Sequence, residues 1–121
     1  MQHETLNSSR FFQMWSYTTS HSELLLRSTK GSGQTTRIDV LFKDVIAIHL
    51  PTIFDSLAIS ESTEEEKSKL HAQIDARKLD GRKTFMVRGG SFPGYVIAAF
   101  VASHEDGGEY YDPSYFSPKT N

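Results

Sequence analysis

The stretch VASHEDGGEYYDPSYF, residues 101–116, gathers five side chains that are able to bind a metal ion or move a proton. They are His104, Glu105, Asp106, Glu109 and Asp112. Calcium prefers acidic oxygens at alternating positions around a glycine, and zinc prefers histidine or cysteine at matched spacing. The acids do not follow the calcium spacing, and His104 is the one histidine of the stretch. We therefore expect neither a metal nor another cofactor, and we interpret the two glycines after Asp106 as a turn.

A second candidate group contains Arg37, Asp39 and His49, which would share one face of a β-hairpin. If RIDVLF and VIAIHL pair through a connection at residues 42–44, Asp39 lies opposite Ala47 and Arg37 opposite His49. A histidine beside a carboxylate can act as a general base, and an arginine can hold an anion. Polar pairs on a solvated face give the same pattern in a sequence. These three residues are the catalytic candidates of an enzyme, which is the least favoured function.

Three basic residues, Arg27, Lys30 and Arg37, border the loop STKGSGQTT at residues 28–36. Such a loop is able to bind a phosphate headgroup through a few charge-assisted hydrogen bonds. This pattern supports the alternative function, a small-molecule or phospholipid-headgroup binding module built on a pleckstrin-like barrel. That architecture usually ends in its helix, whereas the helix expected here precedes two strands.

The C-terminal segment, residues 107–121, is polar but keeps several aromatic residues. Its candidates for partner binding are Tyr110, Tyr111, Asp112, Tyr115 and Phe116. Aromatic side chains are unfavourable in water and are common anchors of protein interfaces. Either this segment folds back over a sheet, or it contacts another protein or a second copy of the chain. We therefore expect a non-catalytic protein-binding or regulatory domain, whose partner is another protein or, by self-association, a homodimer mate.

The tryptophan-containing first strand, together with RIDVLFKDV and GYVIAAFVASHED, resembles the strands of small bacterial domains, some of which are immunity partners of toxins. The resemblance covers the strands alone. It implies a protein-binding role of the immunity type, and no role for a particular residue follows from it.

Bulk composition narrows the classes of function further. The chain has 121 residues, a net charge of −2 and no cysteine. This charge balance gives no electrostatic footprint for nucleic acid, so we expect no nucleic-acid partner. The longest apolar run, YVIAAFVA, is far shorter than the ~20 residues of a spanning helix, so we expect no transmembrane segment. The absence of a signal-peptide pattern and of cysteine together favour a cytoplasmic location.

Strands are predicted where apolar residues alternate, and one helix is predicted where a capping box precedes an apolar stripe. The helix is expected at about 62–79, with Ser62 and Glu65 as its capping box. The strands are expected at 11–20, 24–29, 37–42, 45–50, 56–60, 83–89 and 94–103.

The expected fold belongs to the α+β class. It is a single domain, 1–121, of six to seven mostly antiparallel strands that form a bent sheet or small open barrel with one inserted helix. Residues 1–10 are expected to be a loosely ordered N-terminus, and residues 107–121 are expected to be irregular. Strand 94–103 is apolar on both sides, which predicts a central position with other layers packed against both faces. The expected core residues are Trp15, Ile38, Val40, Ile48, Val96, Ala98 and Phe100.

Overall fold

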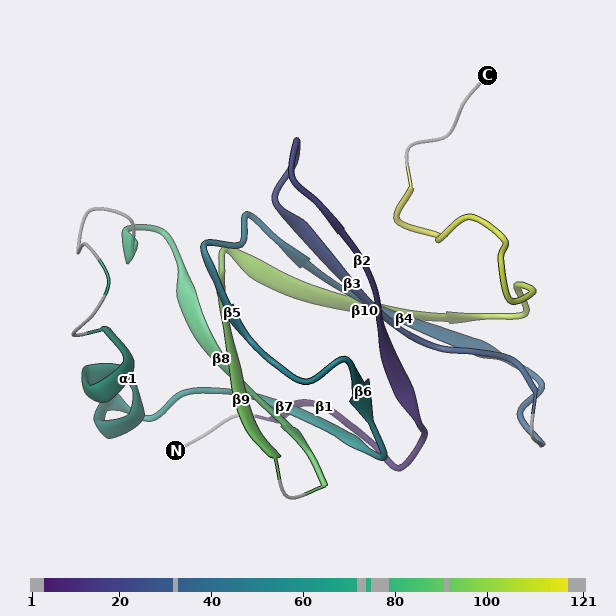
Figure 1. Cartoon of the computed structure of the whole chain (residues 1–121), viewed down its shortest axis with the longest axis horizontal. Helices are drawn as coiled ribbons and strands as arrows, with labels where there is room; N and C mark the ends of the chain where they lie inside the picture. The colour runs from purple at the N-terminus through teal and green to yellow at the C-terminus, as the bar shows by residue number, and fades with distance from the viewer. Residues whose placement is uncertain (1–3, 32, 72–73, 75–78, 91, 118–121) are drawn as a thin grey trace.

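Two five-stranded antiparallel sheets make up the fold (Figure 1). The computed structural model describes residues 4–31, 33–71, 74, 79–90 and 92–117. The first sheet has the order β1 (Glu4–Ser8), β7 (Leu57–Glu61), β8 (Lys83–Gly89), β9 (Phe92–Ala98) and β5 (Ala47–His49). The second sheet has the order β10 (Phe100–Asp106), β4 (Arg37–Lys43), β3 (Glu23–Ser28), β2 (Phe12–Thr18) and β6 (Ile53–Phe54). Helix α1 (Glu64–His71) is inserted between β7 and β8. The expected α+β class with mostly antiparallel strands is confirmed.

The chain passes from one sheet into the other at two bent corners. At the first corner, the chain runs from β4 into β5 and, later in the sequence, from β9 into β10. On one side of the corner β4 pairs with β10, and on the other side β5 pairs with β9. The register places three residues, 44–46, opposite two, 98 and 99. This extra residue is a β-bulge, which bends a strand and increases its twist. Asp44 turns the chain there in a left-handed conformation, with a φ of 57°.

The second corner repeats this arrangement near the N-terminus. Here β1 leads into β2 and β6 leads into β7, and the pairs β1–β7 and β2–β6 lie on either side of the bend. Among the described strands, neither sheet closes on itself. The expected bent sheet or small open barrel is therefore confirmed, with two sheets joined at two corners.

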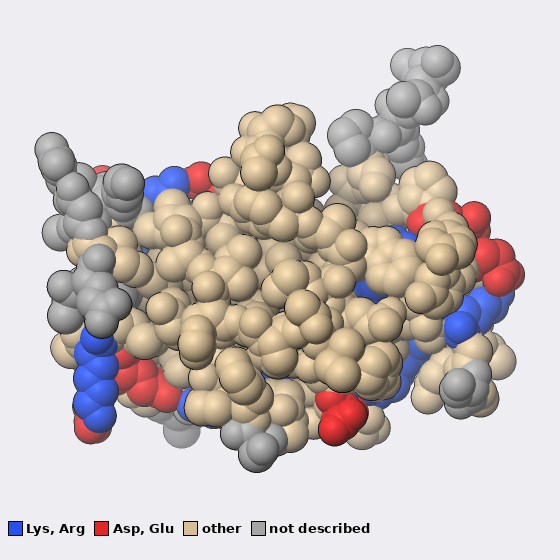
Figure 2. Space-filling model, viewed as in Figure 1, with Lys and Arg blue, Asp and Glu red and all other residues tan. Residues whose placement is uncertain are grey.

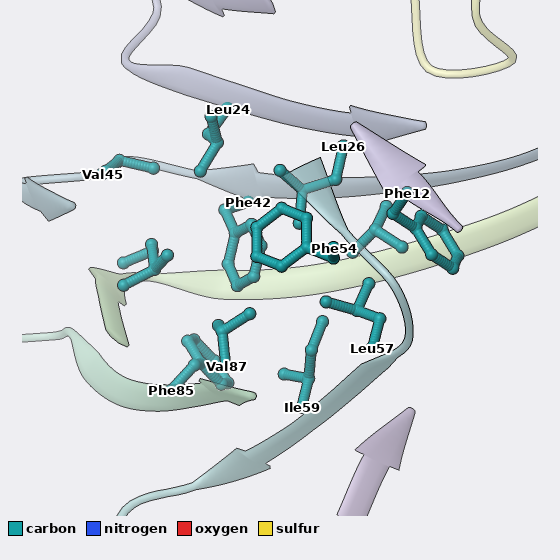
Figure 3. Packing of buried hydrophobic residues seen from close by; sticks show 13 residues of the cluster. Phe12, Leu24, Leu26, Phe42, Val45, Phe54, Leu57, Ile59, Phe85 and Val87 are labelled. Carbon is teal, nitrogen blue, oxygen red and sulfur yellow. The ribbon is translucent and has the colours of Figure 1, made fainter. Parts of the chain in front are cut away.

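The core lies between the two sheets, because each strand turns alternate residues towards the other sheet. Phe42 of the second sheet meets Phe85 of the first, with ring centroids 5.9 Å apart and a T-shaped geometry. Figure 3 shows side chains from both sheets filling the same space. The buried cluster comprises Phe12, Leu24, Leu26, Val40, Phe42, Val45, Phe54, Leu57, Ile59, Phe85, Val87, Val96 and Ala98.

The expected hairpin between RIDVLF and VIAIHL is wrong. These segments contain β4 and β5, which belong to different sheets and pair with β10 and β9 instead of with each other. Residues 44–46 therefore form a corner and not a chain reversal. The expected central strand at 94–103 is likewise two strands, which are separated at Ala99 and belong to different sheets.

Several residues expected in the core lie elsewhere. Val40, Val96 and Ala98 are buried, and Ile38 packs against the core from its rim. Ile48 and Phe100 are exposed. Ile48 lies on the edge strand β5, and Phe100 lies opposite Lys43, on the face of the second sheet that is turned away from the core. Trp15 is half-buried.

A second β-bulge explains the position of Trp15. Met14 and Ser16 pair with neighbouring residues of β3, so Trp15 between them is the extra residue. The bulge interrupts the alternation of β2 and places the indole against residues on the outer face of the second sheet.

Helix α1 begins one residue later than its expected capping box. Thr63 Oγ1 accepts a hydrogen bond from the Glu66 amide at 3.1 Å, and Glu66 Oε1 accepts one from the Thr63 amide at 2.8 Å. The capping box is therefore Thr63 and Glu66, and the prediction of Ser62 and Glu65 is wrong. The hydrogen bond from the Thr63 amide lowers the pKa of Glu66, against the opposing effect of burial. Residues 72–73 and 75–78 of the expected helix lie outside the described residues.

The N-terminus differs from the expectation. Residues 4–8, which we expected to be loosely ordered, form β1 and pair with β7. Residues 1–3 lie outside the described residues. At the other end, residues 107–117 contain neither helix nor strand.

We predict that Ala98→Leu destabilises the protein by about 1–3 kcal/mol, because a larger side chain overpacks a filled core. Ala98 has no exposed surface and belongs to the buried cluster between the sheets. Urea unfolding of the variant measures the change. Ala58→Leu is the control, because Ala58 lies on a strand of the first sheet but is only half-buried. Equal stability losses in the two variants would contradict the position assigned to Ala98.

Candidate functional site

The outer face of the second sheet, turned away from the core, carries a layer of paired charges. Arg27 of β3 lies directly opposite Asp39 of β4, and Asp106 of β10 lies directly opposite Arg37 of β4. Opposite charges at facing positions of neighbouring strands stabilise their pairing. The same alternation that places apolar residues in the core therefore places these four charged residues together.

Arg27 and Asp39 form a bidentate ion pair that is almost completely buried. The Nε and Nη2 atoms of Arg27 donate to Oδ1 and Oδ2 of Asp39 at 2.7 and 3.0 Å, and each side chain is 2% exposed. The remaining nitrogen, Nη1, donates to the carbonyl of Tyr110 at 3.0 Å. The guanidinium carbon lies 4.7 Å from the ring centroid of Trp15, within the range of a cation–π interaction. Among the described residues, no buried side-chain nitrogen or oxygen atom lacks a hydrogen-bond partner.

Arg37 forms a second bidentate pair, with Asp106. Its Nε and Nη2 atoms donate to the two carboxylate oxygens at 3.1 Å each. Burial on its own would lower the pKa of Arg37, but the hydrogen bond with Asp106 and the charges of Asp39, Asp106 and Asp112 outweigh it, so the pKa is raised. The hydrogen bond from Arg37 lowers the pKa of Asp106, against the effect of burial. Both groups are therefore charged at neutral pH.

The two arginines also hold the main chain of the C-terminal segment. Arg37 donates to the carbonyls of Asp112 at 2.7 Å and Pro113 at 3.1 Å, in addition to the bond from Arg27 to Tyr110. A Cβ atom on Gly108 would lie 2.5 Å from the Arg37 guanidinium, so a larger residue there would displace the group whose hydrogen bonds hold the segment. The segment thus folds back over the second sheet (Figure 1).

An ion pair and a turn fix the beginning of the segment. Lys30 Nζ donates to the carbonyl of Gly107 at 3.1 Å and to Glu109 Oε1 at 2.8 Å. Asp112 Oδ2 accepts a hydrogen bond from the Glu109 amide at 2.9 Å, which closes a local turn. Charged side chains gather at this end of the molecule, beyond β10, whereas the middle of the face in Figure 2 is uncharged.

The aromatic side chains of the segment pack on the sheet and still remain accessible. The ring of Tyr110 contacts Trp15 with a centroid distance of 5.0 Å, and Tyr115 stacks on His104 at 3.7 Å. Tyr111 contacts Tyr110 at 4.6 Å but is 84% exposed, and Tyr115 is 57% exposed. The segment thus folds back over the sheet, which is one of the two expected alternatives, and it leaves the rings of Tyr110, Tyr111 and Tyr115 exposed. The aromatic surface comprises Trp15, Tyr110, Tyr111, Tyr115 and Phe116.

The residues proposed from the sequence as catalytic are only partly brought together. Arg37 and Asp39 share the outer face of β4, but His49 lies on β5 in the other sheet, where its ring stacks on Tyr95 at 5.4 Å. The three residues proposed for anion binding all donate hydrogen bonds to the C-terminal segment. Two of them, Arg27 and Arg37, direct their hydrogen bonds to carboxylates and carbonyls, and Lys30 pairs with Glu109.

Sequence reasoning missed Asp106 as a partner of Arg37 and missed the contact between Trp15 and the C-terminal segment. A signal was present in the charges, because the cations of β3 and β4 are complementary to the acids that end β10. The partners could be identified only once it was known that β10 pairs with β4. The sequence gives no signal for the position of Trp15, because the alternation of residues 11–20 does not show that Trp15 forms a β-bulge.

A groove of about 470 Å³ opens beside the C-terminal segment. Leu25 and Leu41 line it together with hydroxyl-bearing residues of β2 and with Phe116. Glu23 and Lys43, which also line the groove, form an ion pair at 3.6 Å.

Three further findings bear on function. Within the described residues, no group of three or more His, Asp and Glu side chains is placed to hold a metal ion. In the same part of the chain, no helix has the length and apolar character needed to cross a membrane. Comparison of the chain with protein-family models, curated proteins and solved structures gives no match.

We predict that Arg27→Met destabilises the protein by about 3–5 kcal/mol, because Asp39 would be left buried without its partner. The combined change Arg27→Met and Asp39→Leu should recover most of this loss, since it removes both charges. Chemical denaturation of both variants measures the free energies of unfolding. Lys83→Met is the control, because Lys83 pairs with Glu61 in an exposed ion pair that should contribute less than about 1 kcal/mol. A loss in Arg27→Met no larger than in the control would contradict the role of the buried pair.

We predict that Asp106→Asn lowers stability at neutral pH by about 1–3 kcal/mol, through loss of a hydrogen-bonded charge on Arg37. The pKa of Asp106 is lower in the folded than in the unfolded protein, so its contribution is complete above the ordinary carboxyl pKa. This contribution is lost as the pH falls through the folded-state pKa, so the gap between the wild type and the variant should narrow below about pH 4. Unfolding free energies measured across this range test the trend, with the exposed Asp55→Asn as the control. A gap that stays constant with pH would rule out the assigned charge state.

Proposed function

We propose that this chain is a non-catalytic protein-binding domain whose docking surface is the aromatic surface on the second sheet. The observation that carries the proposal is the exposure of Tyr111 and Tyr115, at 84% and 57%, on a main chain that Arg27 and Arg37 hold in place. Tyrosine and tryptophan are enriched among the residues that contribute most to binding between proteins. A segment that is already ordered loses less conformational entropy when it binds.

The charges beside the aromatic surface favour a positively charged partner. The side chain of Glu109 is 71% exposed although it pairs with Lys30, and Asp112 is also exposed. In a symmetric homodimer through this surface, the same acidic patch would be present on both sides of the interface, which is unfavourable. We therefore favour a different protein with a basic surface over self-association.

An immunity-type role, in which the domain would cover a basic surface of a toxin, is one form of this function. The absence of cysteine agrees with the cytoplasmic location expected from the sequence.

The groove of about 470 Å³ supports a second candidate function, binding of a small molecule. Its volume lies within the ~300–1,000 Å³ of typical ligand sites, and its walls combine apolar and hydroxyl-bearing side chains. A phospholipid headgroup is a poor fit for the anion-binding residues first considered, because Arg27 and Arg37 already donate to carboxylates.

We predict that a random-peptide library displayed on phage yields binders on the wild-type protein that are lost on the Tyr111→Ala/Tyr115→Ala variant. Affinities of synthetic copies of these peptides should fall about tenfold or more in the variant, because two exposed anchors are removed. Calorimetry measures the affinities.

Tyr17→Ala is the matched control, because Tyr17 is an exposed tyrosine of β2 outside the aromatic surface. Peptides that bind the wild type and the variant equally well, or a library that yields no binder, would contradict the proposal. A dimer that appears in sedimentation experiments and disappears in the variant would instead assign the surface to a second copy.

A further inference from the structure

A shallow pocket of about 260 Å³ lies within the aromatic surface, between β2 and the C-terminal segment. Trp15, Tyr111 and Asp112 are among the residues that line it. The rings of Trp15 and Tyr111 are 6.1 Å apart between centroids and are tilted by 45° to each other. The pocket is smaller than the ~300–1,000 Å³ of sites for drug-sized molecules, so it suits a single side chain.

Two of the residues that line the pocket are charged, Arg27 and Asp112. The guanidinium group of Arg27 is 2% exposed and is neutralised by its bidentate pair with Asp39. Asp112 is exposed, and its Oδ1 atom takes part in no hydrogen bond within the described residues. The accessible charge in the pocket is therefore the negative charge of Asp112.

The aromatic rings are suited to a cation. A ring face carries partial negative charge and attracts an ammonium or guanidinium group within about 6 Å. Trp15 already has the guanidinium group of Arg27 at 4.7 Å from its centroid. The ring that remains open to an incoming group is that of Tyr111, beside the carboxylate of Asp112.

We propose that this pocket receives one cationic side chain, an arginine or a lysine, of the partner protein. The inference rests on the proposed function and names the chemistry that the docking surface recognises. An anionic group would be repelled by Asp112, and an apolar group would desolvate that carboxylate without pairing it. A cation pairs with the carboxylate and lies against the exposed ring of Tyr111.

The test compares two blocked tripeptides, acetyl-Gly-Arg-Gly-amide and the same peptide with citrulline in place of arginine. Citrulline keeps the shape of arginine but has no charge. Binding is followed by NMR through the indole N–H signal of Trp15, which is the only tryptophan in the chain. The arginine peptide should bind about threefold more tightly or better, as expected for a cation beside an aromatic ring and a carboxylate.

Three variants locate the site. Tyr111→Ala and Asp112→Asn should each weaken binding of the arginine peptide, and Asp112→Asn should remove most of its advantage over the citrulline peptide. The amide oxygen introduced by Asp112→Asn can still accept the hydrogen bond from the Glu109 amide, so the local turn is kept while the charge is lost. Tyr17→Ala is the control, since Tyr17 is an exposed tyrosine of β2 that neither belongs to the aromatic surface nor lines the pocket.

Equal binding of the two peptides, or no shift of the Trp15 signal with either, would overturn the inference. Binding that is lost in Tyr17→Ala as strongly as in Tyr111→Ala would also overturn it. The proposed function would stand in these cases if library peptides without arginine or lysine still required Tyr111 and Tyr115.

Discussion

The buried ion pair between Arg27 and Asp39 determines how the second sheet is covered. A buried guanidinium group must direct all of its donors to acceptors, and one carboxylate uses only part of them. Arg27 directs a further donor to the carbonyl of Tyr110, and Arg37 does the same with Asp112 and Pro113. The C-terminal segment is therefore held by its main chain. Because these bonds use carbonyl oxygens, the tyrosine side chains of the segment do not have to anchor it, and those of Tyr111 and Tyr115 remain largely exposed.

The shape of the two-sheet fold depends on a small number of residues that interrupt regular strand pairing. The bulge at residues 44–46 turns one strand from the second sheet into the first, and Val45 reaches the core at that point. The bulge at Trp15 has a different result, because it places a large ring among residues of the outer face. One irregularity thus completes the core, and the other helps to form the aromatic surface.

Features that depend on neighbouring residues were predictable from the sequence. Alternation identified most of the strands, and acidic residues after a capping threonine or serine identified the helix to within one residue at its start. Partners far apart in the chain were not predictable in this way. RIDVLF and VIAIHL have the pattern of a hairpin, but the strands that pair with them begin at Phe92 and Phe100. The candidate site depends on the same distant pairing, since Asp106 faces Arg37 only when β10 lies beside β4.

The first corner also constrains the order in which the chain acquires its structure. The first corner cannot form until β9 and β10 are available, although β4 and β5 come before them in the chain, with β6, β7, α1 and β8 in between. On a ribosome, Val40, Phe42 and Val45 would therefore wait for some of their partners until β9 and β10 have been synthesised. Closing such distant contacts costs loop entropy before burial offsets it, which slows folding. The same apolar strands that build the core are thus exposed to aggregation or to chaperones during that interval.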